Sequence, residues 1–131
     1  MAARQRHTYG EEVANVLTHG AGMLFGMTAI IILMMAAIRS GNPWAIGSFA
    51  VYAVCMTLSY VTSTFYHAST HARQKRLLRR FDHGAIYLHI AGTYTPFTLL
   101  ALRQEGYWGW SLFAVIWIAA VAGVWLSFRK M

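Results

Sequence analysis

The hydrophobic and polar positions of this chain form four long apolar segments separated by short polar ones. The apolar segments cover residues 21–38, 44–66, 84–102 and 108–128, and none of them contains lysine or arginine. Each is close to the roughly 20 residues that an α-helix needs to cross ~30 Å of hydrocarbon. No segment alternates polar and apolar residues with the period of two that a membrane β-barrel needs. The pattern therefore predicts an all-α membrane helix bundle with four transmembrane helices.

A short helix is expected before the first span. Thr8 and Glu11 have the spacing of a capping box, and Glu11 and Glu12 are the acidic residues that the positive end of a helix favours. We expect a cytoplasmic helix that begins near Tyr9 and runs into the first span. A length of 131 residues allows one domain, so residues 1–131 are treated as a single membrane domain.

The basic residues predict the orientation of the spans. Nine lysines and arginines lie before the first span, between the second and third, and after the fourth: Arg4, Arg6, Arg73, Lys75, Arg76, Arg79, Arg80, Arg129 and Lys130. Only Arg39 and Arg103 lie in the other two loops. By the positive-inside rule, we expect both termini and the loop 70–80 to be cytoplasmic.

The composition supports a membrane protein and argues against nucleic-acid binding, which is a common function of basic chains. Apolar residues make up 57% of the chain and charged residues 11%, against about 25% charged in soluble proteins. The net charge of +7 then follows from the topology, reinforced by attraction to anionic headgroups. Nucleic-acid binding needs a soluble basic face, which this pattern does not offer. The single Cys55 lies within a span, allows no disulfide inside the chain, and is read as a packing residue.

Ionisable residues at the ends of two apolar segments are the candidate site. Ser63 and His67 are one helical turn apart at the end of the second segment, and Asp82 precedes the third, so a hairpin places them at similar depth. Such residues beside hydrocarbon cost several kcal/mol unless they are paired or bound to a cation. A neutral imidazole is a good zinc ligand, and a hydroxyl beside it can hold its orientation. The alternative for Asp82 is a helix N-cap or first-turn acid.

Three further polar residues share one face of the helix expected before the first span. Glu12, Asn15 and His19 are separated by three and four residues. They can turn into the bundle and line the candidate site. They can equally form a polar stripe that faces lipid headgroups, and both readings stay open.

Other histidines and one proline have simpler explanations. His71 stands four residues after His67, at metal-ligand spacing if the helix continues, but we read it as a loop residue near headgroups. His89 is read as a neutral, hydrogen-bonded packing residue. Pro96 predicts a kink in the third span, with Gly92 allowing close approach of a neighbouring helix.

Four motifs give the chain a family resemblance. They are EVANVLTH at 12–19, STFYH at 63–67, FDHGAIY at 81–87 and IAGTYTPF at 90–97. From about residue 9 onward, the chain resembles the bacterial hemolysin III proteins, which belong with the progestin and adiponectin receptors. The resemblance implies a multi-pass protein of the bacterial inner (plasma) membrane with a cytoplasmic N-terminus.

The resemblance also implies zinc as a cofactor. The family has seven spans and binds zinc near the cytoplasmic surface, which makes His67 the metal ligand and gives Asp82 and Ser63 the role of orienting water or the ligand. Two further ligands come from a His-x-x-x-His motif in the seventh span, whereas this sequence stops at Met131, after the fourth. We therefore expect a truncated chain with an incomplete zinc site, which binds zinc weakly or not at all and is inactive alone.

Three functions remain open at this stage. The chain can serve in membrane-lipid homeostasis or sensing, act as a zinc-dependent lipid amide hydrolase of ceramidase type, or form pores as a cytolysin. The four spans contain almost no polar stripe that could line water, although an oligomer could build one. The expected partners are membrane lipids and a second copy of the chain, and no nucleic acid.

Overall fold

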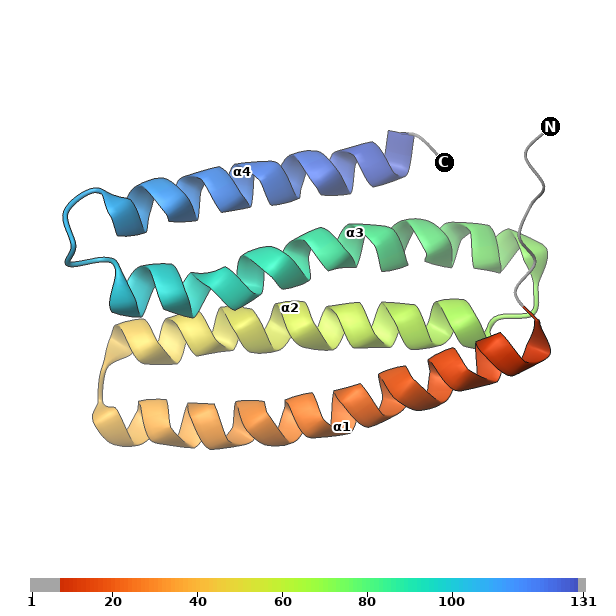
Figure 1. The fold of residues 1–131 in the computed structure, drawn as a ribbon, viewed down its shortest axis with the longest axis horizontal. Coiled ribbons are helices and arrows are strands. Elements are labelled where there is room, and N and C mark those ends of the chain that lie inside the picture. The colour runs from red at the N-terminus through yellow and green to blue at the C-terminus, as the bar shows by residue number, and fades with distance from the viewer. Residues whose placement is uncertain (1–7, 130–131) are drawn as a thin grey trace.

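A computed structural model describes residues 8–129 of the chain, and these residues form a succession of helices (Figure 1). In chain order the elements are α1 (Tyr9–Ser40), α2 (Pro43–Ala68), α3 (Ala72–Pro96), the π-helix η1 (Phe97–Ala101) and α4 (Trp108–Arg129). The described residues contain no β-strand. The predicted all-α fold is therefore confirmed.

Local sequence signals set the ends of α1. Thr8 Oγ1 accepts a hydrogen bond from the Glu11 amide at 3.3 Å, and Glu11 Oε2 accepts one from the Thr8 amide at 2.6 Å, which confirms the capping box. At the other end, Gly41 adopts a φ of +63°, a left-handed conformation that glycine takes without steric cost. The helix expected to begin near Tyr9 is thus continuous with the first span, as one helix of 32 residues.

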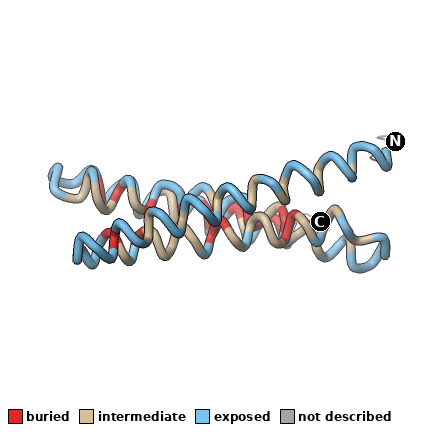
Figure 2. Tube along the Cα trace, turned by 90° about the horizontal axis from the view of Figure 1, so that it is seen from below, coloured by how far each residue is buried: buried red, intermediate tan, exposed pale blue. Residues whose placement is uncertain are grey.

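The helices pack as neighbours along the chain and form a twisted layer (Figure 1 and Figure 2). Close backbone contacts join α1 with α2, α2 with α3, and α3 with α4, while the described part of α1 makes none with α3 or α4. Many large apolar side chains on the outside of the layer are exposed, among them Phe25, Ile31 and Ile118. Such exposure is what a lipid environment allows.

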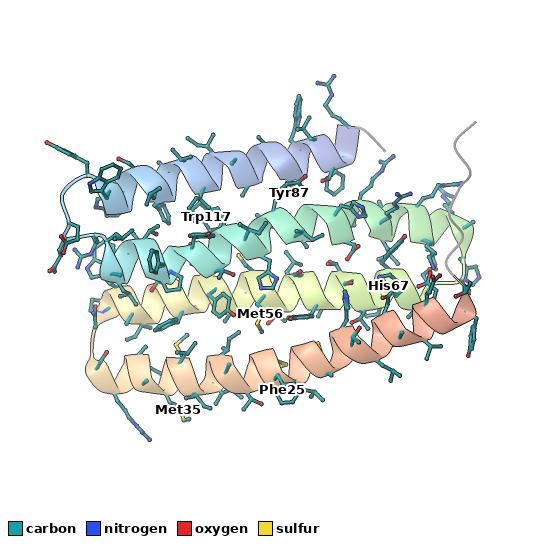
Figure 3. The ribbon with its side chains drawn as sticks, in the orientation of Figure 1. Phe25, Met35, Met56, His67, Tyr87 and Trp117 are labelled. Atoms are coloured by element: carbon teal, nitrogen blue, oxygen red, sulfur yellow. The ribbon has the colours of Figure 1, made fainter. Side chains whose placement is uncertain are left out.

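Small residues and one indole hold α2, α3 and α4 together. A Cβ added at Gly92 would lie 2.6 Å from Cys55 Cβ, so the expected close approach of a neighbour at Gly92 is confirmed. On the other side of α3, Trp117 Nε1 donates a hydrogen bond to Thr95 Oγ1 at 3.0 Å. Trp117 and Tyr87 lie between α3 and α4 (Figure 3), where the Tyr87 ring occupies the space beside Gly123.

The third expected span differs from the other three. By length and composition, three helices of the described chain can cross a membrane, namely α1, α2 and α4. The segment 84–102 is divided between the apolar end of α3, whose basic first turns lower its mean hydropathy, and η1. The π-helix follows directly after Pro96, and the kink expected at this proline stays a prediction.

The basic segment predicted as a loop is helical, and that prediction was wrong. Only three residues separate α2 from α3, which begins at Ala72, and the segment 72–80 forms the first turns of α3. Its arginine, lysine, glutamine and leucine residues are strong helix formers, which explains the extension. Asp82 therefore lies inside α3 and is neither an N-cap nor a first-turn acid, because the N-cap position belongs to His71.

The orientation of these helices stays a prediction that cysteine labelling can test. We expect Gln74→Cys, in a Cys55→Ala background, to resist an impermeant maleimide added to spheroplasts and to react once the membrane is opened. Glu105→Cys, which is exposed at the other end of the layer, should react without opening. The reverse pattern would show that the basic end faces outward.

Candidate functional site

A pocket of about 330 Å³ lies between α1, α2 and α3, toward the end of the layer where α1 begins and α2 ends. We call it the histidine pocket, and its lining residues are His19, Ser59, Tyr60, Ser63, His67, Asp82, Ile86 and His89. Figure 3 labels His67 near the C-terminal end of α2. The pocket is partly open, so its polar groups are within reach of a ligand from outside the layer.

His19 and Ser63 connect α1 with α2 inside the pocket. Ser63 Oγ lies 2.6 Å from His19 Nδ1, within hydrogen-bond distance. The His19 ring packs edge-on against that of His67, with 5.7 Å between centroids. The expectation that Ser63 would pair with His67 was wrong, because its hydroxyl points across to α1.

Glu12 of α1 contacts both α2 and α3. Its Oε2 lies 2.7 Å from His67 Nδ1, and its Oε1 accepts a hydrogen bond from Lys75 Nζ at 2.8 Å. Both the carboxylate and the imidazole are largely buried. When Nδ1 donates to the carboxylate, Nε2 of His67 remains free to accept a proton or bind a ligand.

The electrostatics favour an ionised Glu12. Glu12 lies nine positions before the apolar segment 21–38, and so outside the segment expected to cross the membrane. Burial raises the pKa of Glu12, but the hydrogen bonds and positive charge supplied by Lys75 and His67 outweigh burial and lower the pKa below its ordinary value. The contact therefore stabilises the fold at neutral pH, and this contribution is lost as the pH falls through the lowered pKa.

Asp82 is the buried carboxylate of the pocket. It lies in the third turn of α3 with its side chain 12% exposed, and its Oδ2 is 3.6 Å from His83 Nδ1. His67 and Asp82 line the same pocket from α2 and α3, as their positions in the sequence indicated. Their chemical roles, and that of Ser63, stay predictions.

Sequence reasoning missed several residues of this site. Ser59, Tyr60, Ile86 and His89 also line the pocket, although His89 had been read as a packing residue. The signal was available in the helical spacing, because residues 82, 86 and 89 share one face of α3. Lys75 could not be found in this way, since its contact with Glu12 depends on the unexpected length of α3.

Three predicted residues lie outside the pocket lining, namely Asn15, His71 and Glu12, although Glu12 contacts the lining residue His67. Asn15 is half-buried on the same face as Glu12 and His19 but is not among the residues that line the pocket. His71 precedes α3 and borders a separate cavity of about 270 Å³ at the α2–α3 turn. Because α2 ends at Ala68, His71 does not form a pair with His67 on that helix.

The residues of the pocket do not make a complete zinc site. Among residues 8–129, no group of three or more histidine, cysteine, aspartate or glutamate side chains is placed to hold a metal ion. A catalytic zinc site uses about three protein ligands. His19 and His67 also have their Nδ1 atoms within hydrogen-bond distance of Ser63 and Glu12. Zinc binding by this chain therefore stays a prediction.

Comparison with known proteins identifies the family. A family model described as haemolysin-III related matches residues 7–131. The chain belongs to this family. It is 46% identical to hemolysin-3 of Bacillus cereus over 114 residues, which are 87% of the chain and 51% of that relative. It is 43% identical to a hemolysin-3 homolog of Bacillus subtilis (strain 168) over 117 residues, which are 89% of the chain and 54% of that relative.

Family membership confirms the resemblance and the membrane assignment. The chain is a membrane protein of the haemolysin-III related family, and it spans about half the length of the curated relatives that it matches. No solved structure matches it significantly. The kind of membrane and the side on which the termini lie stay predictions.

Removal of the Glu12 carboxylate should destabilise the fold. In Glu12→Ala, His67 and Lys75 lose their shared partner, so we expect a loss of about 1–2 kcal/mol in the free energy of unfolding at pH 7. Thermal unfolding in detergent, followed by tryptophan fluorescence, measures this loss.

Glu105→Ala is the matched control, because Glu105 is exposed in the loop between α3 and α4 and should change little. The gap between the wild type and a Glu12→Gln variant should narrow as the pH is lowered, since protonation removes the charge of Glu12 in the wild type. A gap that is constant from pH 7 to pH 4 would contradict the role given to the Glu12 charge.

Proposed function

We propose that this chain serves in membrane-lipid homeostasis and that the histidine pocket recognises the polar part of a bilayer lipid. The observation that carries the proposal is the convergence of His19, Ser63, His67 and Asp82 from three helices in one partly open pocket. Polar side chains beside hydrocarbon need partners, and a lipid headgroup can supply them.

The chemistry of the lining indicates the kind of lipid. Imidazole and hydroxyl groups can donate hydrogen bonds to a carbonyl oxygen, and the carboxylate of Asp82 can accept them from a hydroxyl or an amide N–H. Tyr60 and Ile86 add apolar surface to the same pocket. This combination favours a lipid whose polar part carries an amide and hydroxyl groups.

A photoactivatable ceramide analogue with a diazirine group tests the proposal. In vesicles that contain the purified chain, we expect cross-links to peptides that line the pocket and competition by unlabelled ceramide. Ser63→Ala should reduce the cross-linking several-fold, because it removes a polar group of the pocket and frees His19 from its partner.

Ser48→Ala supplies the matched control. Ser48 and Ser63 are both buried serines of α2, but the Ser48 hydroxyl bonds to the Trp44 carbonyl at the other end of the helix. An equal effect of the two substitutions, or cross-links spread evenly along the apolar helices, would refute lipid recognition in the pocket.

A second candidate is zinc-dependent hydrolysis of a lipid amide. It is favoured by the carboxylate at His67 Nδ1, since metal-binding histidines commonly donate their other ring N–H to such a group. When bound, zinc would supply a water whose pKa falls toward 7. Because the described residues do not complete the metal site, this reaction needs ligands from outside them, and His67 is the residue of this chain that would bind the metal.

Metal analysis of the purified 131-residue chain separates the two candidates. We expect clearly less than one zinc per chain, because the described residues form no group of three or more metal-binding side chains and so lack most of the roughly 10–16 kcal/mol seen for complete structural sites. His67→Ala and His71→Ala serve as controls. One tightly bound zinc per chain that is lost in His67→Ala would show that this chain builds a complete site, alone or as an oligomer.

The pore-forming alternative finds no support in the pocket. On α2 the lining runs only from Ser59 to His67, about two helical turns, and so does not extend along the span. Association with a second copy, which a pore would need, stays a prediction.

A further inference from the structure

The first turns of α3 extend past the last described turn of α4. The rings of Phe81 and Phe128 pack edge-on with 5.2 Å between centroids, which places these two residues at one level. The described part of α4 ends one residue later, at Arg129. The segment 73–80, about 12 Å of helix at ~1.5 Å per residue, therefore has no described α4 residue beside it.

The face of segment 73–80 that has no described α4 residue beside it is strongly basic. Arg73, Arg76 and Arg80 follow a spacing of three and four residues, so they share one face. Gly84, four residues after Arg80, packs against Val124 and Phe128 of α4, which shows that this face is the one turned toward α4. We call this face, formed by Arg73, Arg76 and Arg80 with Arg129 of α4 beside it, the cationic shelf.

The charges of the shelf have no protein partner among residues 8–129. No described carboxylate lies within ion-pair distance of Arg73, Arg76, Arg79 or Arg80. Lys75, on the opposite side of the same helix, contrasts with them because it bonds to Glu12. Within residues 8–129, the basic residues of this segment thus divide into Lys75, which bonds to Glu12, and arginines without a carboxylate partner, of which Arg73, Arg76 and Arg80 lie on the shelf.

The position of the arginines in the helix makes an anionic ligand more favourable. Arg73 lies in the first turn of α3, where the helix dipole is positive, and this turn has no acidic residue and no side-chain cap at His71. The dipole repels Arg73, and the neighbouring arginines repel one another. A bound anion would offset both effects.

The surroundings of the shelf indicate that the anion belongs to a lipid. Leu77 is 52% exposed and Phe81 45% exposed, beside the arginines and next to the start of an apolar segment. On α4, the Arg129 guanidinium lies 4.6 Å from the ring centroid of Trp125, itself exposed. Arginines mixed with exposed aromatic and apolar side chains at the end of apolar helices are typical of the headgroup layer.

We infer that the cationic shelf binds the phosphate headgroup of an anionic phospholipid. The guanidinium groups bind phosphate through paired N–H donors, and Leu77 and Phe81 contact the upper part of the acyl chains. This site is distinct from the histidine pocket, because Lys75, Asp82 and His89 lie on the opposite face of α3.

Native mass spectrometry of the full chain in detergent, titrated with phosphatidylglycerol or phosphatidylcholine, tests the inference. We expect the wild type to bind phosphatidylglycerol at least tenfold more tightly. The double variant Arg73→Gln/Arg80→Gln should reduce this preference to about twofold or less, while Arg73→Lys/Arg80→Lys should keep most of it. Thermal unfolding of each variant shows that it is folded.

The matched control removes the same charge at the other end of the layer. Arg39→Gln/Arg103→Gln should leave the preference for phosphatidylglycerol unchanged. If this control lost the preference as strongly as Arg73→Gln/Arg80→Gln, the attraction would depend on net charge only and the inference would be overturned. Equal binding of phosphatidylglycerol and phosphatidylcholine by the wild type would also overturn it. If millimolar inorganic phosphate displaced bound phosphatidylglycerol as strongly as added phosphatidylglycerol does, the shelf would be a site for free phosphate. Unchanged ceramide cross-linking in Arg73→Gln/Arg80→Gln would separate this result from the histidine pocket.

Discussion

The carboxylate of Glu12 bonds to His67 and Lys75, and these two contacts hold the candidate site together. Glu12 lies on α1, His67 on α2 and Lys75 on α3, and close backbone contacts join α1 only to α2. In the described part of the chain, the side chain of Glu12 therefore gives α1 a direct contact with α3. Because it orients the His67 ring through Nδ1, it also decides which nitrogen that residue presents to the pocket.

Much of the fold could be predicted because strong local signals agree with the apolar pattern. The capping box at Thr8 and the close approach at Gly92 are both present. The basic segment 72–80 is helical although its charge is also typical of a loop, because arginine and lysine favour helices. The partners of Ser63 and His67 could not be predicted, since they depend on how α1 crosses α2 and not on spacing within either helix.

The layered arrangement explains why a polar pocket can exist in a chain that is so apolar. Helices that pack only with their neighbours along the chain leave both faces of the layer open to lipid or to further protein. Apolar side chains tolerate that exposure, whereas histidine and aspartate do so only near the membrane surface or against a ligand. The pocket accordingly lies toward the basic end of the layer, where its side chains pair across three helices.

The early start of α3 gives one helix two separate tasks. If α3 began at Asp82, as a capping role for that residue would require, Lys75 would not reach Glu12 and the arginines would lie in a loop. Because the helix begins at Ala72, its period places Lys75 and Asp82 on the face toward α1 and α2, and Arg73 and Arg80 on the face toward α4. The same ten-residue extension of α3 thus fixes both the Glu12–Lys75 contact and the arginines of the shelf. A rotation of α3 that moved one of these faces would move the other as well.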